Sequence, residues 1–247
     1  MKKIILTSSF GTNKKVDGKR YPCEMNNANN YVDILKSLLV TQDRLVLVSS
    51  NPNEYVINDD VRNVTEKSFN MSGFNFKEVI MLDKRNANDT ENIIKNSDVV
   101  MLCGGHVPTQ NNWFKEINLK QILSNYNGLI IGGSAGSMNC AKTVYCPPEL
   151  EGEAINPNFN KWIDGLGLTD INIFPHYSDL LDEEIDGFKM IDDIVLKDSF
   201  QSPIYTLNDG SFIKIADEEI IIYGECYKIH NGIITLFCED DKTVRLI

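Results

Sequence analysis

Residues 129–139 read Leu-Ile-Ile-Gly-Gly-Ser-Ala-Gly-Ser-Met-Asn, an apolar run that breaks into a turn of small residues. The apolar run predicts a strand, and the residues after the turn can continue as a helix. The spacing Gly-x-Ser-x-Gly lets a strand turn sharply into a helix, because glycine tolerates strained dihedrals and leaves the serine hydroxyl unshielded. We interpret Ser134 as the candidate nucleophile of a nucleophile elbow. The backbone N–H of Ala135 is then a candidate donor to an oxyanion.

The spacing alone also allows other interpretations of this turn. A glycine-rich strand-to-helix turn can also bind phosphate, and small-residue turns are common in α/β proteins. The stretch lacks the Gly-x-Gly-x-x-Gly pattern of dinucleotide-binding folds, and no Gly-Lys-Ser/Thr follows it. A phosphate loop would therefore have to work without its usual lysine.

Strand-like and helix-length segments alternate upstream of the elbow. Strands are predicted at 4–7, 45–48, 79–82 and 99–103, and helices at 26–40, 56–69, from about 90, and at 109–126. This βαβαβ order predicts an α/β three-layer sandwich with a mostly parallel sheet. After it come a strand at 171–174, an amphipathic segment at 182–196, and short strands with tight hairpin turns between 204 and 237. We expect these last strands to extend the same sheet in antiparallel fashion, within a single domain spanning residues 1–247.

A second glycine turn follows the predicted strand at 99–103. Gly104 and Gly105 come directly after this strand. Because ligands gather at the carboxyl ends of parallel strands, this turn and the elbow should face one pocket. Gly105 is therefore a second candidate oxyanion donor, although a tight turn after a strand needs glycine for conformational reasons alone.

A serine nucleophile needs a general base, and the chain has three histidines. His230 lies in a predicted hairpin turn, whereas His176 follows the strand at 171–174. We choose His176, because triads on elbow folds run Ser, acid, His along the chain, and keep His106 as the fallback. By that order the acid lies between the serine and the histidine, and the candidates are Glu149, Glu151, Glu153, Asp164 and Asp170.

Composition restricts the partners. The chain has 35 acidic and 24 basic residues, a formal net charge of −11, and no basic run, which argues against nucleic acid or an anionic membrane as partner. Its six cysteines form no Cys-x-x-Cys pair, so no zinc site or disulfide framework is expected. We expect no metal and no cofactor. The amino terminus is too weakly apolar for a signal peptide, so a cytoplasmic protein is expected, as a monomer or a homodimer.

Four motifs together resemble a known family. They are Gly-Gly at 104–105, Gly-Ser-Ala-Gly-Ser at 133–137, Asn-Ile-Phe-Pro-His-Tyr at 172–177 and Asp-Gly-Ser at 209–211. This combination is similar to serine peptidases that include aspartyl dipeptidase (peptidase E) and the cyanophycinases. The resemblance implies a flavodoxin-like fold, as in class I glutamine amidotransferases, with serine in place of their cysteine. It also implies Ser134 as nucleophile, His176 as base, and Gly105 and Ala135 as oxyanion donors. In the dipeptidase the triad acid lies about fifteen residues after the serine. The resemblance therefore implies Glu149 as the acid here, with Glu151 as the next candidate.

The chain departs from the aspartyl dipeptidase pattern at one point. That enzyme is expected to bind the substrate aspartate through an arginine downstream of its histidine, and this chain has no arginine between Arg85 and Arg245. Lys189 offers a point charge without the bidentate geometry of arginine. The resulting hypothesis is a serine exopeptidase or dipeptidase-like hydrolase that cleaves short peptides through a Ser134-His176-Glu149 triad and an acyl-enzyme. The alternatives are a non-catalytic module that binds a small ligand on the same scaffold, and an esterase or amidase.

Overall fold

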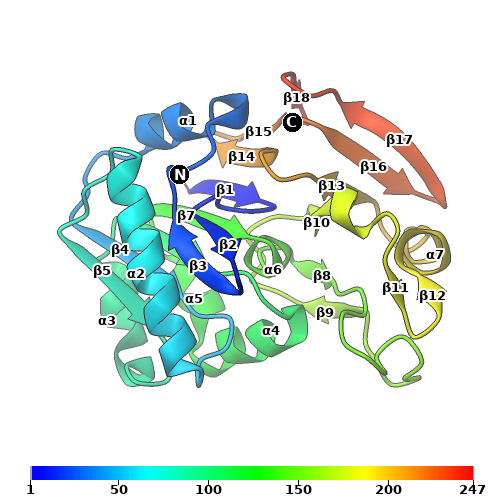
Figure 1. The fold of residues 1–247 in the computed structure, drawn as a ribbon, viewed down its shortest axis with the longest axis horizontal. Helices are drawn as coiled ribbons and strands as arrows, with labels where there is room; N and C mark the ends of the chain where they lie inside the picture. Colours follow the sequence, from blue (N-terminus) through cyan, green and yellow to red (C-terminus); the bar gives the residue numbers. More distant parts are fainter. Residues whose placement is uncertain (1, 247) are drawn as a thin grey trace.

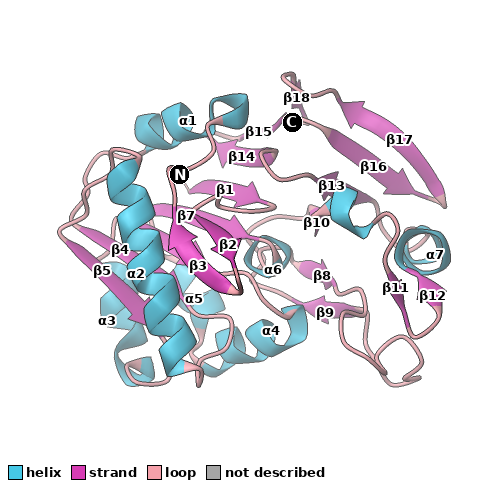
Figure 2. Ribbon diagram, viewed as in Figure 1, coloured by secondary structure: helices cyan, strands magenta, loops and turns pink. Residues whose placement is uncertain are grey.

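The computed structural model describes residues 2–246 and places an eight-stranded sheet at the centre of the molecule (Figures 1 and 2). Its strand order is β18-β15-β14-β1-β7-β6-β4-β5. The strands are β1 (Lys3–Thr7), β4 (Arg44–Val48), β5 (Glu78–Leu82), β6 (Val99–Leu102), β7 (Leu129–Gly133), β14 (Phe212–Ala216), β15 (Glu219–Tyr223) and β18 (Thr243–Arg245). The first five run parallel to one another, and the last three are antiparallel. The predicted α/β fold with a mostly parallel sheet is confirmed.

Helices cover both faces of the parallel strands. Helices α1 (Tyr31–Leu38) and α2 (Tyr55–Met71) pack on one face (Figure 1), and α3 (Thr90–Lys95), α4 (Val107–Glu116) and α5 (Leu119–Ser124) pack on the other. Side chains alternate between these two cores along each strand. In β4, Leu45 and Leu47 join the core under α1 and α2, whereas Val46 and Val48 join the opposite core. The strand is apolar at each of these positions because both of its faces are buried.

A second sheet lies on the side of the molecule away from β4 and β5 (Figure 1). Its order is β10-β13-β16-β17, with β10 (Asn172–Pro175), β13 (Ile204–Leu207), β16 (Cys226–His230) and β17 (Ile233–Cys238). The expectation that the late strands extend the central sheet is therefore confirmed for β14 and β15. It is wrong for β13, β16 and β17, which belong to the second sheet. The reason is a separate apolar core, to which Phe174, Ile204 and Ile229 contribute from three strands of this sheet.

Several local predictions are corrected by backbone geometry. The helix predicted at 109–126 divides into α4 and α5 because Asn118 adopts a left-handed conformation with φ 53°. The amphipathic segment at 182–196 begins as a hairpin of β11 (Glu184–Ile185) and β12 (Phe188–Lys189), since Asp186 and Gly187 have positive φ. It ends in a π-helix (Met190–Val195) and α7 (Leu196–Asp198). Further short elements are β2 (Asn13–Val16), β3 (Lys19–Pro22), β8 (Thr143–Tyr145), β9 (Trp162–Asp164) and 3-10 turns at Ala28–Asn30, Ala87–Asp89 and Tyr177–Leu180.

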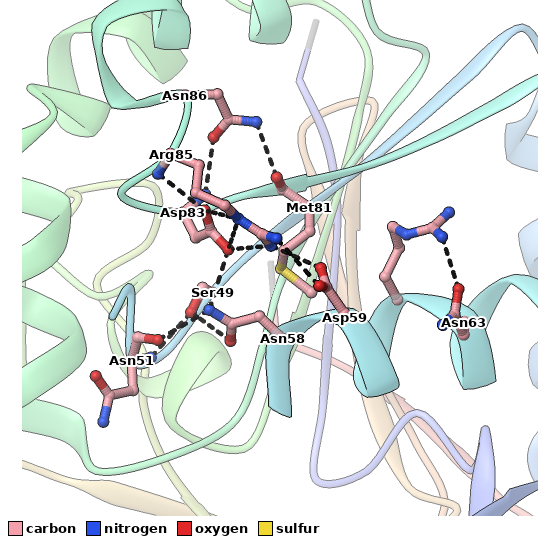
Figure 3. Close-up of polar contacts among 10 residues, drawn as sticks. Ser49, Asn51, Asn58, Asp59, Asn63, Met81, Asp83, Arg85 and Asn86 are labelled. Atoms are coloured by element: carbon pink, nitrogen blue, oxygen red, sulfur yellow. Dashed lines mark hydrogen bonds and ion pairs between the residues drawn. The ribbon is translucent and has the colours of Figure 1, made fainter. Parts of the chain in front are cut away.

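A buried polar cluster ties together the carboxyl ends of β4 and β5 (Figure 3). The Asp83 side chain is fully buried and accepts hydrogen bonds from the Arg85 guanidinium. Asn58 of α2 donates to Asp83 Oδ2 at 3.2 Å, and Ser49 Oγ donates to Asn58 Oδ1 at 3.0 Å. A buried carboxylate is tolerated only when it is paired and hydrogen-bonded in this way. The cluster fixes the loop after β4, which borders the site described below.

Among the residues described, no helix combines the length and the apolar composition needed to cross a membrane.

Candidate active site

The proposed elbow lies where three parallel strands end together. Thr7 of β1 pairs with Gly133 of β7, and Leu102 of β6 pairs with Gly132, so the segments after these strands emerge at one edge. Ser134 follows β7 with φ 50° and ψ −120°, a conformation that non-glycine residues rarely adopt. Such a backbone costs about 1–3 kcal/mol and persists only where its surroundings enforce it. The Ser134 N–H donates to the Thr7 carbonyl at 3.0 Å, which is part of that enforcement.

Close packing explains the small residues beside Ser134. A Cβ on Gly136 would lie 2.1 Å from the Leu102 carbonyl oxygen, and one on Gly132 would lie 2.7 Å from the Ser137 Cα. Ser137 itself is buried, and its hydroxyl donates to the Thr7 carbonyl at 2.7 Å. The turn is therefore clamped against β1 and β6. The helix that follows, α6 (Ala135–Met138), is a single turn, so its dipole adds little at this site.

Gly105 and Ala135 are the predicted oxyanion donors. Within residues 2–246, the N–H groups of Gly105 and Ala135 donate to no protein acceptor. A Cβ on Gly105 would lie 2.6 Å from the Ser50 side chain, which packs against this turn from the loop after β4. Free N–H groups near a nucleophile are suited to binding the negative oxygen of a tetrahedral intermediate.

His176 is held by a hydrogen-bond network from two other strands. It follows β10 in a left-handed conformation, with φ 56°. Its N–H donates to Ser8 Oγ at 2.9 Å, and its Nδ1 lies 3.0 Å from Asp209 Oδ1. Ser8, fully buried after β1, also donates its hydroxyl to Asp209 Oδ1 at 2.7 Å. Asp209 follows β13, which pairs with β10 in parallel, so both residues leave the second sheet at the same end.

This network assigns the proton on the imidazole of His176. Hydrogen bonds from His176 and Ser8 lower the pKa of Asp209 below its usual value, so the carboxylate is ionised near neutral pH. An ionised carboxylate accepts, hence Nδ1 carries the proton and donates to Asp209. Nε2 of the neutral ring then keeps a lone pair and has no protein partner among the described residues. That is the protonation state a general base requires.

Glu149, the predicted triad acid, lies in the same cavity but is not hydrogen-bonded to His176 among the described residues. The carboxylate that contacts the imidazole is Asp209. The parallel register of β10 and β13 brings the Asp209 turn beside His176, and a sequence pattern does not reveal that register. Glu151 also lines the cavity and, within residues 2–246, makes no hydrogen bond to the imidazole. Glu153 is bonded instead to His106, with 3.0 Å between Oε1 and Nε2.

The other two histidines, of which His106 is the predicted fallback, already have hydrogen-bond partners. His106 has Nδ1 at 2.8 Å from Thr109 Oγ1 and Nε2 at 3.0 Å from Glu153 Oε1, so neither ring nitrogen is free to accept a proton from Ser134. His230 Nδ1 lies 3.3 Å from the Ser199 carbonyl, away from the elbow. Geometry thus favours His176 over His106 as the base.

A cavity of about 640 Å³ unites these groups. Gly105, Ser134, Glu149 and His176 line it together. Its apolar wall includes Met138, Phe174, Pro175, Leu180 and Met190, and its remaining carboxylates are Glu151, Glu183, Glu184 and Asp186. The cavity is large enough for a short peptide, since ligand pockets commonly measure about 300–1,000 Å³.

The model of Peptidase family S51 matches residues 50–223 of the chain. The chain belongs to this family. It is therefore a serine peptidase, a hydrolase, and family membership favours catalysis over the alternative of a binding module. No curated protein matches this S51 peptidase in sequence.

Two solved structures share the fold of this S51 peptidase. One is a peptidase from an acI-B1 Actinobacterium, with a TM-score of 0.67 and 12% identity, covering 98% of this chain and 96% of that one. The other is a putative peptidase E protein from Listeria monocytogenes EGD-e, with a TM-score of 0.58 and 19% identity, covering 90% of this chain and 98% of that one. At such identities the similarity concerns the fold.

Sequence reasoning missed Asp209 and Ser8. Asp209 opens the Asp-Gly-Ser motif at 209–211, but an Asp-Gly pair by itself predicts a hairpin turn. The order Ser, acid, His along the chain also predicts an acid before His176, whereas Asp209 lies 33 positions beyond it. Ser8 carried no signal, since a serine after a strand is common.

Glu149→Gln is expected to stabilise the protein increasingly as pH rises. Burial, followed by the charge of Glu153, raises the pKa of Glu149 from 4.5 to about 7. Between these values the folded chain binds more protons at Glu149 than the unfolded chain does, so its contribution to stability falls as pH rises. Urea unfolding at pH 5 and pH 8 measures this change, with Glu151→Gln as the matched control. A difference between Glu149→Gln and wild type that is the same at both pH values would contradict the raised pKa.

Proposed function

We propose that this S51 peptidase hydrolyses short peptides with a free amino terminus, with Ser134 as nucleophile, His176 as general base and Asp209 as the acid that orients it. The observation that carries this proposal is the 3.0 Å contact between His176 Nδ1 and Asp209 Oδ1 in a network whose imidazole shares a cavity with Ser134. The contact leaves Nε2 as the basic nitrogen. The strained backbone of Ser134 supports the same assignment, because strain of this kind gathers at functional sites.

The proposed reaction passes through an acyl-enzyme. Ser134 Oγ attacks the carbonyl carbon of the scissile bond while its proton passes to His176 Nε2. The N–H groups of Gly105 and Ala135 donate to the oxyanion that forms. The C–N bond then breaks as His176 returns the proton to the leaving amine. Water attacks the acyl-enzyme and gives a proton to His176, which passes it to Ser134 Oγ as the ester bond breaks and the acyl product leaves with a free carboxyl group. Asp209 stabilises the imidazolium at both stages.

The charges around the cavity bear on the substrate. Glu149, Glu151, Glu183 and Glu184 line it without an ion-pair partner among the described residues, and its lining includes no lysine or arginine. Lys189, predicted as a substitute for the missing arginine, is not part of this lining. Its Nζ lies 3.9 Å from Asp192 Oδ2. An aspartate side chain would meet carboxylates there, whereas a substrate ammonium group would be attracted. We therefore propose that the enzyme does not select peptides beginning with aspartate.

Dipeptides that differ only in their first residue test this substrate proposal. Ala-Xaa and Lys-Xaa are expected to be cleaved at least as fast as Asp-Xaa, because no guanidinium in the cavity can hold the aspartate. N-acetylated forms serve as controls for the free amino terminus and should be cleaved more slowly. Initial rates, measured from the free amino groups that hydrolysis releases, give kcat/KM for each peptide. A preference of about a hundredfold for Asp-Xaa, equal to about 2.7 kcal/mol, would show that another residue supplies a positive charge.

A further inference from the structure

His106 connects the Gly105 turn to the segment that carries Glu149. It directly follows Gly105 and precedes α4, and its side chain is only 20% exposed. The Thr109 hydroxyl lies 2.8 Å from Nδ1, and Glu153 Oε1 lies 3.0 Å from Nε2. A neutral imidazole satisfies both contacts when Thr109 donates to Nδ1 and Nε2–H donates to Glu153. The ring is thereby fixed in one orientation, with no lone pair left for proton transfer.

Glu153 connects His106 to the backbone of the segment that carries Glu149. Its second oxygen, Oε2, accepts the backbone N–H of Glu149 at 2.8 Å and of Leu150 at 3.0 Å. The Glu153 side chain is 16% exposed, so the attachment is mostly shielded from water. One carboxylate thus joins a histidine next to the Gly105 donor to the backbone of Glu149.

The same segment is attached to the β11–β12 hairpin as well. Asp186, in the turn of that hairpin, accepts the N–H of Gly152 at 2.8 Å and of Ala154 at 2.9 Å. On the side of the Gly105 turn, the segment is held by the contact between His106 and Glu153 and by the Val107 N–H, which interacts with the Glu149 carboxylate. Unlike an exposed ion pair, which contributes little to stability, this shielded pair joins two segments that border the site.

We propose that His106 is a positioning residue. It acts through Glu153 to fix the position of the Gly105 N–H relative to the segment that carries Glu149. The inference rests on the proposed function, because it assumes that the Gly105 N–H binds an oxyanion at Ser134. Loss of one oxyanion donor costs about 10²–10³-fold in kcat, so a misplaced donor should cost less. The effect should appear in the chemical step and leave substrate binding nearly unchanged.

His106→Ala is expected to lower kcat about 10- to 100-fold, with KM changed less than about threefold. Activity is expressed per active site titrated with a fluorophosphonate, so misfolded enzyme does not enter the rate. The rate of phosphonylation should fall with kcat, because the phosphoryl oxygen occupies the same hole. His106→Gln, which keeps an N–H donor toward Glu153, should restore most of the rate. Glu153→Ala should match His106→Ala, and the double variant should be no worse than either single one.

His230→Ala is the matched control, since His230 lies on β16 and bonds to the Ser199 carbonyl. If His106→Ala does not fold, Thr109→Ala removes the partner of Nδ1 and should lower kcat severalfold. Unchanged kcat and phosphonylation per titrated site in these variants would overturn the positioning role alone. Wild-type enzyme that neither cleaves peptides nor reacts at Ser134 would overturn the proposed function, and this inference with it.

Discussion

Ser134→Ala is expected to reduce kcat/KM for short peptides by about four orders of magnitude or more. Without the hydroxyl no acyl-enzyme forms, and only binding and the oxyanion donors remain to accelerate attack by water. Steady-state hydrolysis of the best dipeptide measures the loss. A variant that keeps more than about a tenth of wild-type kcat/KM would remove Ser134 from the mechanism.

Ser134→Gly is the matched control for folding. It also lacks the hydroxyl, but glycine adopts φ 50° without strain, so its resistance to urea should equal or exceed that of wild type. The two variants should therefore share the loss of activity and differ in stability. If Ser134→Gly loses as much activity as Ser134→Ala but is the more stable protein, the loss is due to the missing hydroxyl and not to an effect on the fold.

Asp209→Asn is expected to lower kcat/KM by about 10²- to 10⁴-fold. An asparagine amide can donate to Nδ1 and favour the tautomer that places the proton on Nε2, where it cannot accept the serine proton. It also removes the charge that stabilises the imidazolium. Asp217→Asn, in the turn between β14 and β15, controls for a change of the same chemistry away from the cavity. The pH profile of kcat/KM for both variants checks the assignment.

Glu149→Gln provides the contrast that decides between the two candidate acids. We expect a change in kcat/KM below about tenfold, because Glu149 shares the cavity with His176 but makes no hydrogen bond to it among the described residues. If Glu149→Gln loses the larger activity and Asp209→Asn retains most of it, the assignment from the sequence resemblance is right and Asp209 is a structural residue.

The elbow and the central sheet could be predicted because their signals are local. Ser134 stands in a spacing whose glycines are required by contacts within the turn, and β4 and β6 are apolar at almost every position since both faces are buried. The acid could not be found in this way. The position of Asp209 depends on parallel pairing between β10 and β13, which are separated by the hairpin and helices at 184–198. Pairing over such a distance is set by the shared core and not by either strand alone.

Backbone conformation explains the remaining differences. Asn118 and Asp186 interrupt segments whose apolar spacing is helical, because each adopts a left-handed conformation at a turn. Asparagine and aspartate tolerate this conformation, yet both residues also occur within helices. Their effect was therefore not evident from the periodicity. The hairpin that Asp186 forms supplies Glu184 and Ile185 to the cavity wall, so part of the candidate site depended on a turn that periodicity does not reveal.

The most direct test of Ser134 as the nucleophile is reaction with a fluorophosphonate, followed by intact-mass measurement and peptide mapping. One phosphonyl group per chain is expected, located on Ser134; it should be absent from Ser134→Ala and form more slowly in Asp209→Asn. Peptide hydrolysis should disappear in proportion to the labelled fraction. Full peptidase activity in enzyme that carries the label, or a label on a residue other than Ser134, would contradict the account.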